Sequence, residues 1–421
     1  MNSQRQAGIS LPGQMIGEHC RISAFLKNIF AHCHADRKDA NITIYYSIAD
    51  ARQELAQLRA DVPAALSYDH LETMERSLTD AEFRYVFVYR DERPVLFLYF
   101  QLFTVTSQNF ALDIKRAVVK NLVHLLLDLR QAKVLVAGNA LRNGQQVLCY
   151  DTAALSLTDA LDALVSVADR IAASDSVVAT ILPRPEGADK RQLHMLERQG
   201  YTIPWEDSVM EMEVWEGWET LQDYVNALSR KYKARANKIL AEVAELKIEP
   251  LSVKDIEKHG AVMDALFLQV VDRQPFTLSR AGAAYIRELK KLYGEELEVI
   301  GYFKEERLIA FYSGIVTGDA YEIYYVGFDA ALNNEYPLYF HILMHGLERA
   351  IILRKKTLKL GRTSFDAKAS LGAKAVSTGH SIKLRHVPDV ALQWFTRYFS
   401  AAEDGKWKQR NPLKAKETAR T

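Results

Sequence analysis

The order of predicted strands and helices occurs twice along this chain of 421 residues, and the repetition restricts the fold more than any single motif does. Each half reads as a strand, two helices, an antiparallel hairpin or meander, a long helix, a strand ending at glycine, a helix and a last strand. A repeat at this scale indicates duplicated modules rather than a solenoid, whose period is far shorter. We therefore predict an α+β (mixed α/β) fold of two tandem domains, each a mixed, largely antiparallel sheet flanked by helices.

The clearest strand signals of the first half are FRYVFVYR (83–90) and PVLFLYFQLFTV (94–105), which a short polar break separates. The second run is apolar almost throughout, which is typical of a central strand buried on both faces. FALDIKRAVVKNLVHLLLDL (110–129) has the spacing of an amphipathic helix. VMEMEVW (209–215) is predicted to be the last strand of this half, and SIKLRHV (381–387) a late strand of the second.

These patterns divide the chain into five parts. Between them, composition shifts from apolar and periodic to polar and basic. The predicted parts are a loose N-terminal tail (1–20), a first domain (21–217), a basic helical connection (218–245), a second domain (246–400) and a basic flexible tail (401–421).

Composition limits the partners that overall charge could attract. The chain is 48% hydrophobic and 25% charged with a net charge of +1, so the total charge implies neither a nucleic acid nor a membrane. Three widely spaced cysteines (Cys20, Cys33 and Cys149) fit a reducing compartment better than a disulfide framework. No signal peptide and no uncharged apolar run of spanning length is visible, so we predict a cytoplasmic protein.

The segment TLKLGRTSFDAKASLGAK (357–374) is the most distinctive local pattern. It reads as a short strand, a tight turn at Gly361 and a short helix. Thr363 and Asp366 have the spacing of a reciprocal cap of that helix, and Gly372 falls where a helix end favours a residue with positive φ.

Two cations flank the predicted start of this helix. Arg362 precedes it and Lys368 lies inside it. Together with free backbone N–H groups they form a candidate seat for a carboxylate, a phosphate or an acyl-carrier group. The alternative is a surface link between strand and helix whose cations only face water.

The element order resembles the GNAT acyltransferase fold, and its duplication resembles the tandem arrangement of FemAB-type peptidoglycan aminoacyltransferases and FemAB-like acyltransferases. The segment LKLGRTSFDAKASLGA is similar to the (D/L)-x-G-(R/G)…(Y/A)-K…(F/L)-G pattern of that group, with Gly361, Arg362, Lys368 and Gly372 on the matching positions. SRKYKARANKIL (229–240) resembles the basic helix that opens their second domain.

The resemblance implies an N-acyltransferase that uses an acyl-CoA donor, no metal, and an amine of a cell-envelope precursor, peptidoglycan precursor, lipid or other small molecule. Ordinary GNAT enzymes hold the CoA pyrophosphate in a glycine-rich loop, whereas the corresponding segments here read FDAALNNEYPLYFHI and TVTSQNFALDI. Two alternatives therefore stay open. One is an aminoacyl-tRNA donor, and the other is a non-catalytic module that binds a peptide, lipid or partner.

Three residues are candidates for the chemistry of amide formation. Glu322 lies on the fourth strand of the second half, where GNAT enzymes often place a base. If the period of two holds, Tyr324 shares its side of the strand and Tyr325 points to the opposite face. His341 shares a helix face with His345 and is a minor candidate for the base. The alternative interpretations are an exposed carboxylate, aromatic packing and histidine packing.

Substrate contacts are predicted at two places. The helix start at Thr363 and Ser364 would supply donors to the oxyanion. Lys231 and Arg235 line one side of the basic helix, where they would grip a phosphate-bearing donor, an RNA or a lipid head group, or else form a solvated face.

The remaining signals are weaker. KWKQRNPLKAK (406–416) is predicted to be disordered, with weak contact to an anionic membrane surface as its functional variant. His19-Cys20 and His32-Cys33-His34 fit no standard zinc spacing, so we assign no metal ligand.

Overall fold

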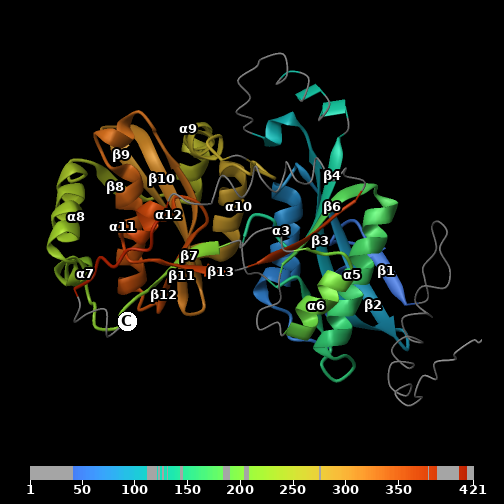
Figure 1. Ribbon diagram of the computed structural model, residues 1–421. Coiled ribbons are helices and arrows are strands. Elements are labelled where there is room, and N and C mark those ends of the chain that lie inside the picture. Colours follow the sequence, from blue (N-terminus) through green and yellow to red (C-terminus); the bar gives the residue numbers. More distant parts are fainter. Residues whose placement is uncertain are drawn as a thin grey trace, which may run out of the picture.

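The computed structural model consists of two modules arranged side by side, each built on one seven-stranded sheet (Figure 1). The two-module, mixed α/β arrangement predicted from the element order is confirmed. The predicted N-terminal tail lies outside the described residues, as does most of the predicted helix at 110–129. The structure describes residues 41–110, 121, 124–125, 128–129, 131–142, 146–183, 190–202, 208–274, 276–377, 379–385 and 407–414.

The first sheet has the strand order β1-β2-β3-β4-β6-β14, with β5 paired to β3. The predicted hairpin is confirmed: Val86 lies opposite Leu98, and the turn residues Asp91 and Glu92 both have positive φ, as a tight hairpin turn requires. Only β4 and β6 run parallel. The strands are β1 (Ile42–Tyr45), β2 (Ala81–Arg90), β3 (Arg93–Val105), β4 (Ala132–Ala137), β5 (Leu148–Tyr150), β6 (Val177–Pro183) and β14 (His380–Leu384).

Helices cover both faces of this sheet, which explains why β3 is apolar on both sides. Successive residues of β2 belong to different core clusters: Tyr85 packs with the helices on one face and Val86 with those on the other. The first face carries α2 (Arg52–Gln57) and α3 (Tyr68–Ser77), and the second carries α5 (Leu157–Ser174). A shorter helix, α6 (Lys190–Arg198), follows β6.

The second sheet has the order β13-β7-β12-β11-β10-β9-β8, and its predicted meander of three strands is confirmed as β9, β10 and β11. Two helices pack on the face toward the first module, and α11 packs on the other, where α7 and α8 lie against it. The strands are β7 (Ser208–Glu213), β8 (Lys247–Pro250), β9 (Leu297–Lys304), β10 (Arg307–Thr317), β11 (Ala320–Phe328), β12 (Thr357–Gly361) and β13 (Lys374–Ser377). The helices are α7 (Leu221–Ala227), α8 (Arg230–Glu242), α9 (Val253–Val271), α10 (Ala283–Tyr293), α11 (Leu338–Ile352) and α12 (Phe365–Ala369).

Two strands cross between the modules. β7 was predicted to end the first half, but it lies in the second sheet between β12 and β13, where Met210 and Met212 are buried. β14 was predicted to belong to the second half, but it pairs with β6 of the first sheet. Both assignments were wrong because alternation identifies a strand without identifying its partner.

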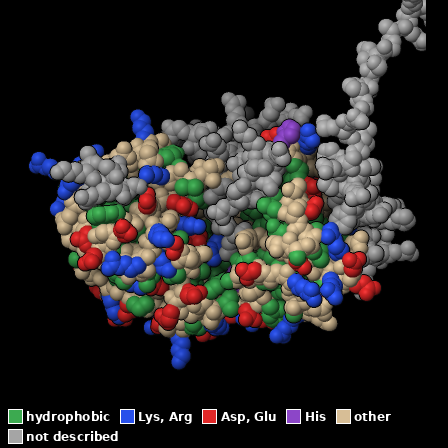
Figure 2. All heavy atoms as spheres, turned by 90° about the horizontal axis from the view of Figure 1, so that it is seen from below, with side chains coloured by type: hydrophobic (Ala, Val, Ile, Leu, Met, Phe, Trp, Pro, Cys, Tyr) green, Lys and Arg blue, Asp and Glu red, His purple; other side chains and the backbone are tan. Residues whose placement is uncertain are grey.

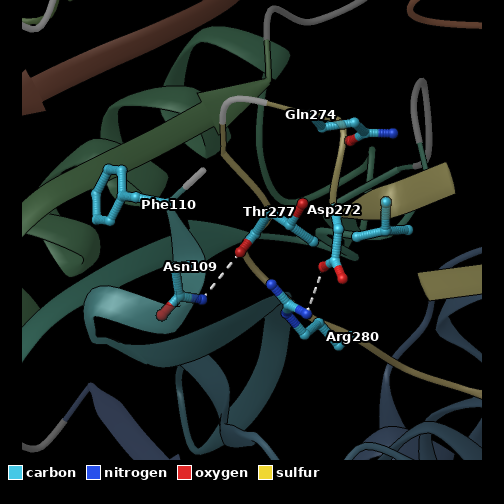
Figure 3. Close-up of a pocket in the computed structure, with 7 residues that line it drawn as sticks. Asn109, Phe110, Asp272, Gln274, Thr277 and Arg280 are labelled. Carbon is cyan, nitrogen blue, oxygen red and sulfur yellow. Dashed lines mark hydrogen bonds and ion pairs between the residues drawn. The ribbon is translucent and has the colours of Figure 1, made fainter. Parts of the chain in front are cut away.

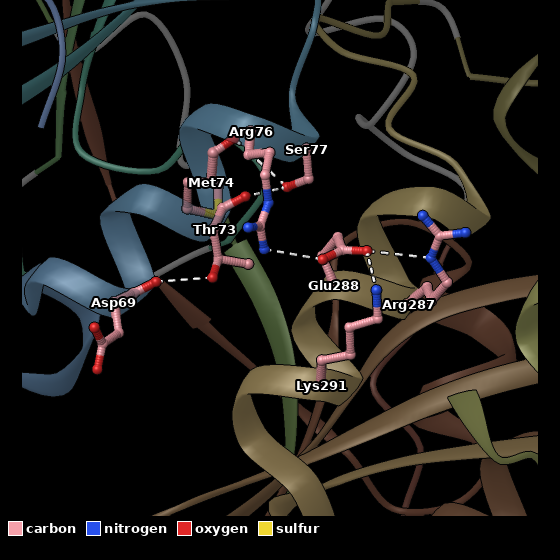
Figure 4. A network of polar contacts seen from close by, with 8 residues as sticks. All are labelled: Asp69, Thr73, Met74, Arg76, Ser77, Arg287, Glu288 and Lys291. Atoms are coloured by element: carbon pink, nitrogen blue, oxygen red, sulfur yellow. Dashed lines mark hydrogen bonds and ion pairs between the residues drawn. The ribbon is translucent and has the colours of Figure 1, made fainter. Parts of the chain in front are cut away.

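The seam between the modules is a shared core with an ionic edge. Leu71 and Met74 of α3 belong to the same hydrophobic cluster as Leu289 of α10. At the edge, the carboxylate of Glu288 in α10 is surrounded by three cations (Figure 4). It forms ion pairs with Arg76 of α3 at 3.0 Å, with Arg287 at 3.1 Å and with Lys291 at 2.7 Å. The hydrogen bond from Lys291 is the first cause of the lowered pKa of Glu288.

The exchange of β7 predicts that the second module cannot be cut at the boundary inferred from the sequence. A fragment of residues 218–377 keeps α7 and α8 but lacks β7, so β12 and β13 lose their common partner. We expect no cooperative urea transition for it by circular dichroism, and a sharper transition for the matched fragment 208–377. Equal cooperativity in both fragments would contradict the importance of β7.

Candidate active site

The strands β11 and β12 of the second module diverge toward their carboxyl ends. They pair in parallel over only three residues each, from Ala320 opposite Thr357 to Glu322 opposite Lys359. β11 then continues to Phe328 and β12 to Gly361. In open α/β sheets, ligands bind outside the carboxyl ends of the strands, so the segment that follows β12 is the first place to look for a site.

The turn that follows β12 has an unusual backbone. Gly361, Thr363 and Ser364 all have positive φ, at 70°, 64° and 52°. The predicted reciprocal cap of Thr363 and Asp366 is wrong, since Ser364 is the N-cap and makes no side-chain cap hydrogen bond. Left-handed conformations at both residues place Thr363 before the helix rather than at its cap. Non-glycine residues in this region store strain of about 1–3 kcal/mol each and often mark functional sites.

Lys368 lies inside this turn rather than on its surface. The residue is 2% exposed, and its Nζ donates hydrogen bonds to the carbonyl oxygens of Gly361, at 3.0 Å, and Arg362. Burial lowers the pKa of its amine to about 7. Among the described residues, no carboxylate forms an ion pair with it. The result is an amine at the end of β12 that is neutral in a large share of molecules near pH 7, unlike an ordinary lysine. The predicted C-terminal glycine of the motif is also confirmed, because Gly372 has a φ of +108°.

Other predicted substrate-binding residues gather around this turn on the surface. Ser364 shares a side-chain hydrogen bond with Tyr339 in the first turn of α11. Arg235 of α8 lies 4.0 Å above the ring of Phe340, also in that first turn. Arg362 is exposed, with Nη2 3.3 Å from Nδ1 of His380 in β14. Lys231 is exposed on the same side of α8 as Arg235, and Thr363 is exposed too.

Three backbone donors that could hold an acyl donor are already occupied. At the start of α11, the amide of Tyr339 donates to the side-chain oxygen of Asn333 at 3.0 Å, and that of Leu338 donates to Tyr336 at 2.6 Å. In β11, the amide of Tyr325 donates to the hydroxyl of Ser313 at 3.0 Å. An anion at this end of the sheet must therefore rely on side chains more than on the helix terminus.

A β-bulge changes where the predicted tyrosines point. The register between β10 and β11 shifts so that Tyr324 and Tyr325 together face Ser313. The two rings lie 4.7 Å apart and both contact the ring of Tyr285. The prediction that Tyr324 and Tyr325 point to opposite faces is wrong, because the bulge interrupts the period of two.

Glu322 and Tyr324 lie at the seam between the modules. Oε2 of Glu322 accepts hydrogen bonds from Nε and Nη2 of Arg142 at 3.1 and 2.9 Å, and the two side chains are only 15% and 9% exposed. Tyr324 shares a 2.7 Å hydrogen bond with Tyr285. Burial is the first cause of its strongly raised pKa. Neither residue has a hydrogen bond or an ion pair to Lys368 in the described part of the chain.

His341 is a buried residue of α11. Its Nδ1 is 3.1 Å from the hydroxyl of Tyr302, which also lies 3.3 Å from Nδ1 of His345. Burial lowers the pKa of His341 to about 3 and that of His345 to about 4, so both are neutral near pH 7. The packing interpretation of this pair therefore agrees with its surroundings.

No sequence pattern indicated the residues that complete the seam. Arg142 follows β4 in the first module, 180 positions before Glu322, and no local pattern links them. His70 and Tyr293 pair at 2.6 Å across the same seam. Burial, and then the charge of Arg142, lower the pKa of His70 to about 4. Only aligned sequences, in which paired positions change together, could have indicated these contacts in advance.

The seam between the modules also contains a polar cavity. A cavity of about 170 Å³ lies where the end of β3 meets the chain after α9, and Arg280 bridges Asp272 and the carbonyl of Gln108 at its rim (Figure 3). Asn109 donates from its amide to the carbonyl of Thr277 at 2.9 Å. The polar groups at this rim are engaged with one another, so we assign it no role in catalysis.

The described residues contain no cluster of His, Cys, Asp or Glu that could hold a metal ion. The considered histidine and cysteine groups at 19–20 and 32–34 lie outside this part. No described helix is both long and apolar enough to cross a membrane. On the face shown in Figure 2, basic and acidic side chains are interspersed, in agreement with the small net charge.

No family model and no curated protein matches this chain. Among solved structures it is similar to FemX, with 10% identity and a TM-score of 0.47 over 84% of this chain and 99% of that one. It is similar to a GCN5-related N-acetyltransferase from Anabaena variabilis ATCC 29413, with 11% identity and a TM-score of 0.45 over 82% and 72% of the two chains. It is also similar to a tandem GNAT protein from the clavulanic acid biosynthesis pathway, with 11% identity and a TM-score of 0.43 over 83% and 100%.

The buried pair of Arg142 and Glu322 yields a stability prediction. Glu322→Gln leaves the guanidinium of Arg142 buried without its countercharge, so we expect a loss of about 3 kcal/mol in the free energy of unfolding, measured in urea. The double variant Arg142→Met/Glu322→Gln should recover part of that loss, which a double-mutant cycle quantifies. If the losses in unfolding free energy of Arg142→Met and Glu322→Gln simply added up in the double variant, the pair would not hold the seam.

Proposed function

We propose that this chain is an N-acyltransferase whose site lies in the second module, at the turn between β12 and α12. One observation carries the proposal: a buried amine with two carbonyl partners, and with no ion-paired carboxylate among the described residues, lies at the carboxyl end of a central strand. A surface link would leave this lysine in water, as the alternative interpretation required. Perturbed, buried titratable groups of this kind concentrate at functional sites.

Lys368 is suited to take a proton from the attacking amine. A neutral amine has two N–H bonds and one lone pair, and the carbonyls of Gly361 and Arg362 accept the two N–H bonds. The lone pair is then left to accept a proton. When the acceptor nitrogen forms its bond to the acyl carbon, the nitrogen loses a proton to Lys368 Nζ. The bond from the acyl carbon to the leaving sulfur or oxygen breaks, and that proton passes to the leaving group.

We assign anion binding to the exposed cations around the turn. Arg362, Arg235 and Lys231 would contact the phosphates of the donor, since the first amides of α11 are bonded within the chain. Thr363 and Ser364 would contribute donors near the acyl oxygen. This arrangement suits an acyl-CoA donor, with an aminoacyl-tRNA as the alternative that a similar set of phosphate contacts would also accommodate.

The acceptor in this proposal is an amine of a cell-envelope precursor or lipid, reached from the cytoplasm. Glu322, Tyr324 and His341 have supporting roles: the first two hold the seam, and the third fills the core under α11. We therefore move the role of base from Glu322 to Lys368.

An assay can test the activity directly. Purified protein is incubated with a panel of acyl-CoA thioesters and amines, and the release of free thiol is measured. A thermal-shift screen against the same thioesters comes first, because a bound ligand raises the melting temperature. Binding without thiol release from any pair would favour the non-catalytic module, and salt-sensitive RNA binding would favour the aminoacyl-tRNA donor.

The role of Lys368 predicts the pH dependence of the rate. A base is active when deprotonated, so kcat/KM should rise with pH through about 7 and level off above it. Lys368→Met should reduce kcat at least about 100-fold, in line with the usual contribution of general acid–base catalysis. Lys368→Arg should be equally inactive because a guanidinium remains protonated.

The matched control is Lys374→Met, which removes an exposed lysine from β13. It should keep the full rate and the same pH profile. A Lys368→Met variant with a wild-type rate would remove the proposed base.

A further inference from the structure

A short C-terminal segment lies against the candidate site. Residues 407–414, which we call the strap, were predicted to be part of a flexible tail but are in contact with α7, α8 and α12. Leu413 forms an antiparallel bridge with Leu228. On either side of it, the amide of Ser229 donates to Pro412 at 2.8 Å and the amide of Lys414 donates to Ala227 at 3.0 Å. The strap is thus paired to the junction of α7 and α8 as a short strand would be.

The other end of the strap contacts the first residues of α12 and the chain that follows this helix. The ring of Trp407 lies 5.3 Å from that of Phe365, and Arg410 forms an ion pair with Asp366 at 2.8 Å. These two partners are the first two residues of α12. Beyond the helix, the side-chain amide of Gln409 donates to the carbonyl of Ala373 at 3.1 Å.

α12 depends on such contacts because it has little stability of its own. It contains five residues, lacks a side-chain cap, and follows two residues in the left-handed conformation. A helix this short is not stable in isolation. Its inner side is fixed by the hydrogen bonds of Lys368 and by the hydroxyl of Tyr224, which donates to the carbonyl of Leu371 at 2.9 Å. The strap supplies the contacts on the outer side.

We propose that the strap is a positioning element that keeps α12 packed against β7, at the end of β12, and so keeps the amine of Lys368 enclosed between the carbonyls of Gly361 and Arg362. Trp407 and Arg410 act through α12 and touch no substrate. The proposal concerns the geometry of Lys368 and rests on the proposed function only for its catalytic consequence. Loss of the strap contacts would let water reach the Lys368 amine.

The test measures the reactivity of Lys368 in the full-length protein. Trp407→Ala and Arg410→Gln are each pulse-labelled with acetic anhydride across a pH series, and acetylation of Lys368 is quantified by mass spectrometry. In the wild type we expect slow labelling with a midpoint near pH 7. In both variants labelling should be at least about 10-fold faster at high pH, and the midpoint should move toward the ordinary lysine value of 10.5, because burial no longer disfavours the charged form.

Controls separate this positioning role from general destabilisation and from the function itself. Lys408→Ala changes an exposed strap residue and should label like the wild type. Trp407→Phe and Arg410→Lys keep a ring and a charge and should restore most of the protection. Arg410→Gln removes the ion pair with Asp366 and a hydrogen bond with Tyr232 but no apolar packing, so it stays informative if Trp407→Ala does not fold.

Unchanged labelling of Lys368 in a folded Arg410→Gln or Trp407→Ala variant would overturn the positioning role. The labelling readout does not require turnover, so the two proposals can fail separately. If Lys368→Met were fully active while the strap variants still exposed Lys368, the proposed function would fall and the strap inference would stand.

Discussion

Each half of the chain contributes one strand to the sheet of the other half, and the rest of the structure depends on this exchange. β7 completes the second sheet between β12 and β13, and β14 completes the first beside β6. Each module therefore needs the other's part of the chain before its own hydrogen bonds are made. The clusters that join α3 to α10 then bury apolar surface across the seam, and the charges around Glu288 lie at its edge. The two modules are consequently parts of one folding unit rather than beads on a linker.

The fixed seam explains the different fates of the predicted catalytic residues. Glu322 and Tyr324 lie on β11 before and at the bulge, where that strand faces α10 and the first module. Oε2 of Glu322 is bonded to Arg142, and the hydroxyl of Tyr324 is bonded to Tyr285. The turn residues that follow β12, from Arg362 to Ser364, are exposed instead, so this turn is the part of the second sheet still open to chemistry.

The sequence was informative where the signal is local, and uninformative where two distant segments meet. The hairpin of β2 and β3, the meander, and the positive φ of Gly372 all follow from alternation or from turn chemistry over a few residues. The partner of β7, the bulge at Tyr324 and the pairing of Arg142 with Glu322 depend on contacts between distant positions, which a single sequence does not reveal. The strap belongs to the same class, since its basic composition resembles that of a disordered tail while its contacts order it.

The sequence pattern around Lys368 predicts an anion site, and the structure gives Lys368 a different environment. Spacing suggested two cations at a helix start, arranged to hold an anion. The helix is instead too short and too poorly capped to act as an anion site, and Lys368 turns inward to the carbonyls of its own turn. Burial of an amine among carbonyls, without a carboxylate, favours its neutral form, and a neutral amine is a proton acceptor rather than an anion receptor. The loop after β4 in the first module has no lysine at an equivalent place and contributes Arg142 to the seam instead, so the corresponding segments of the two modules differ in what they present.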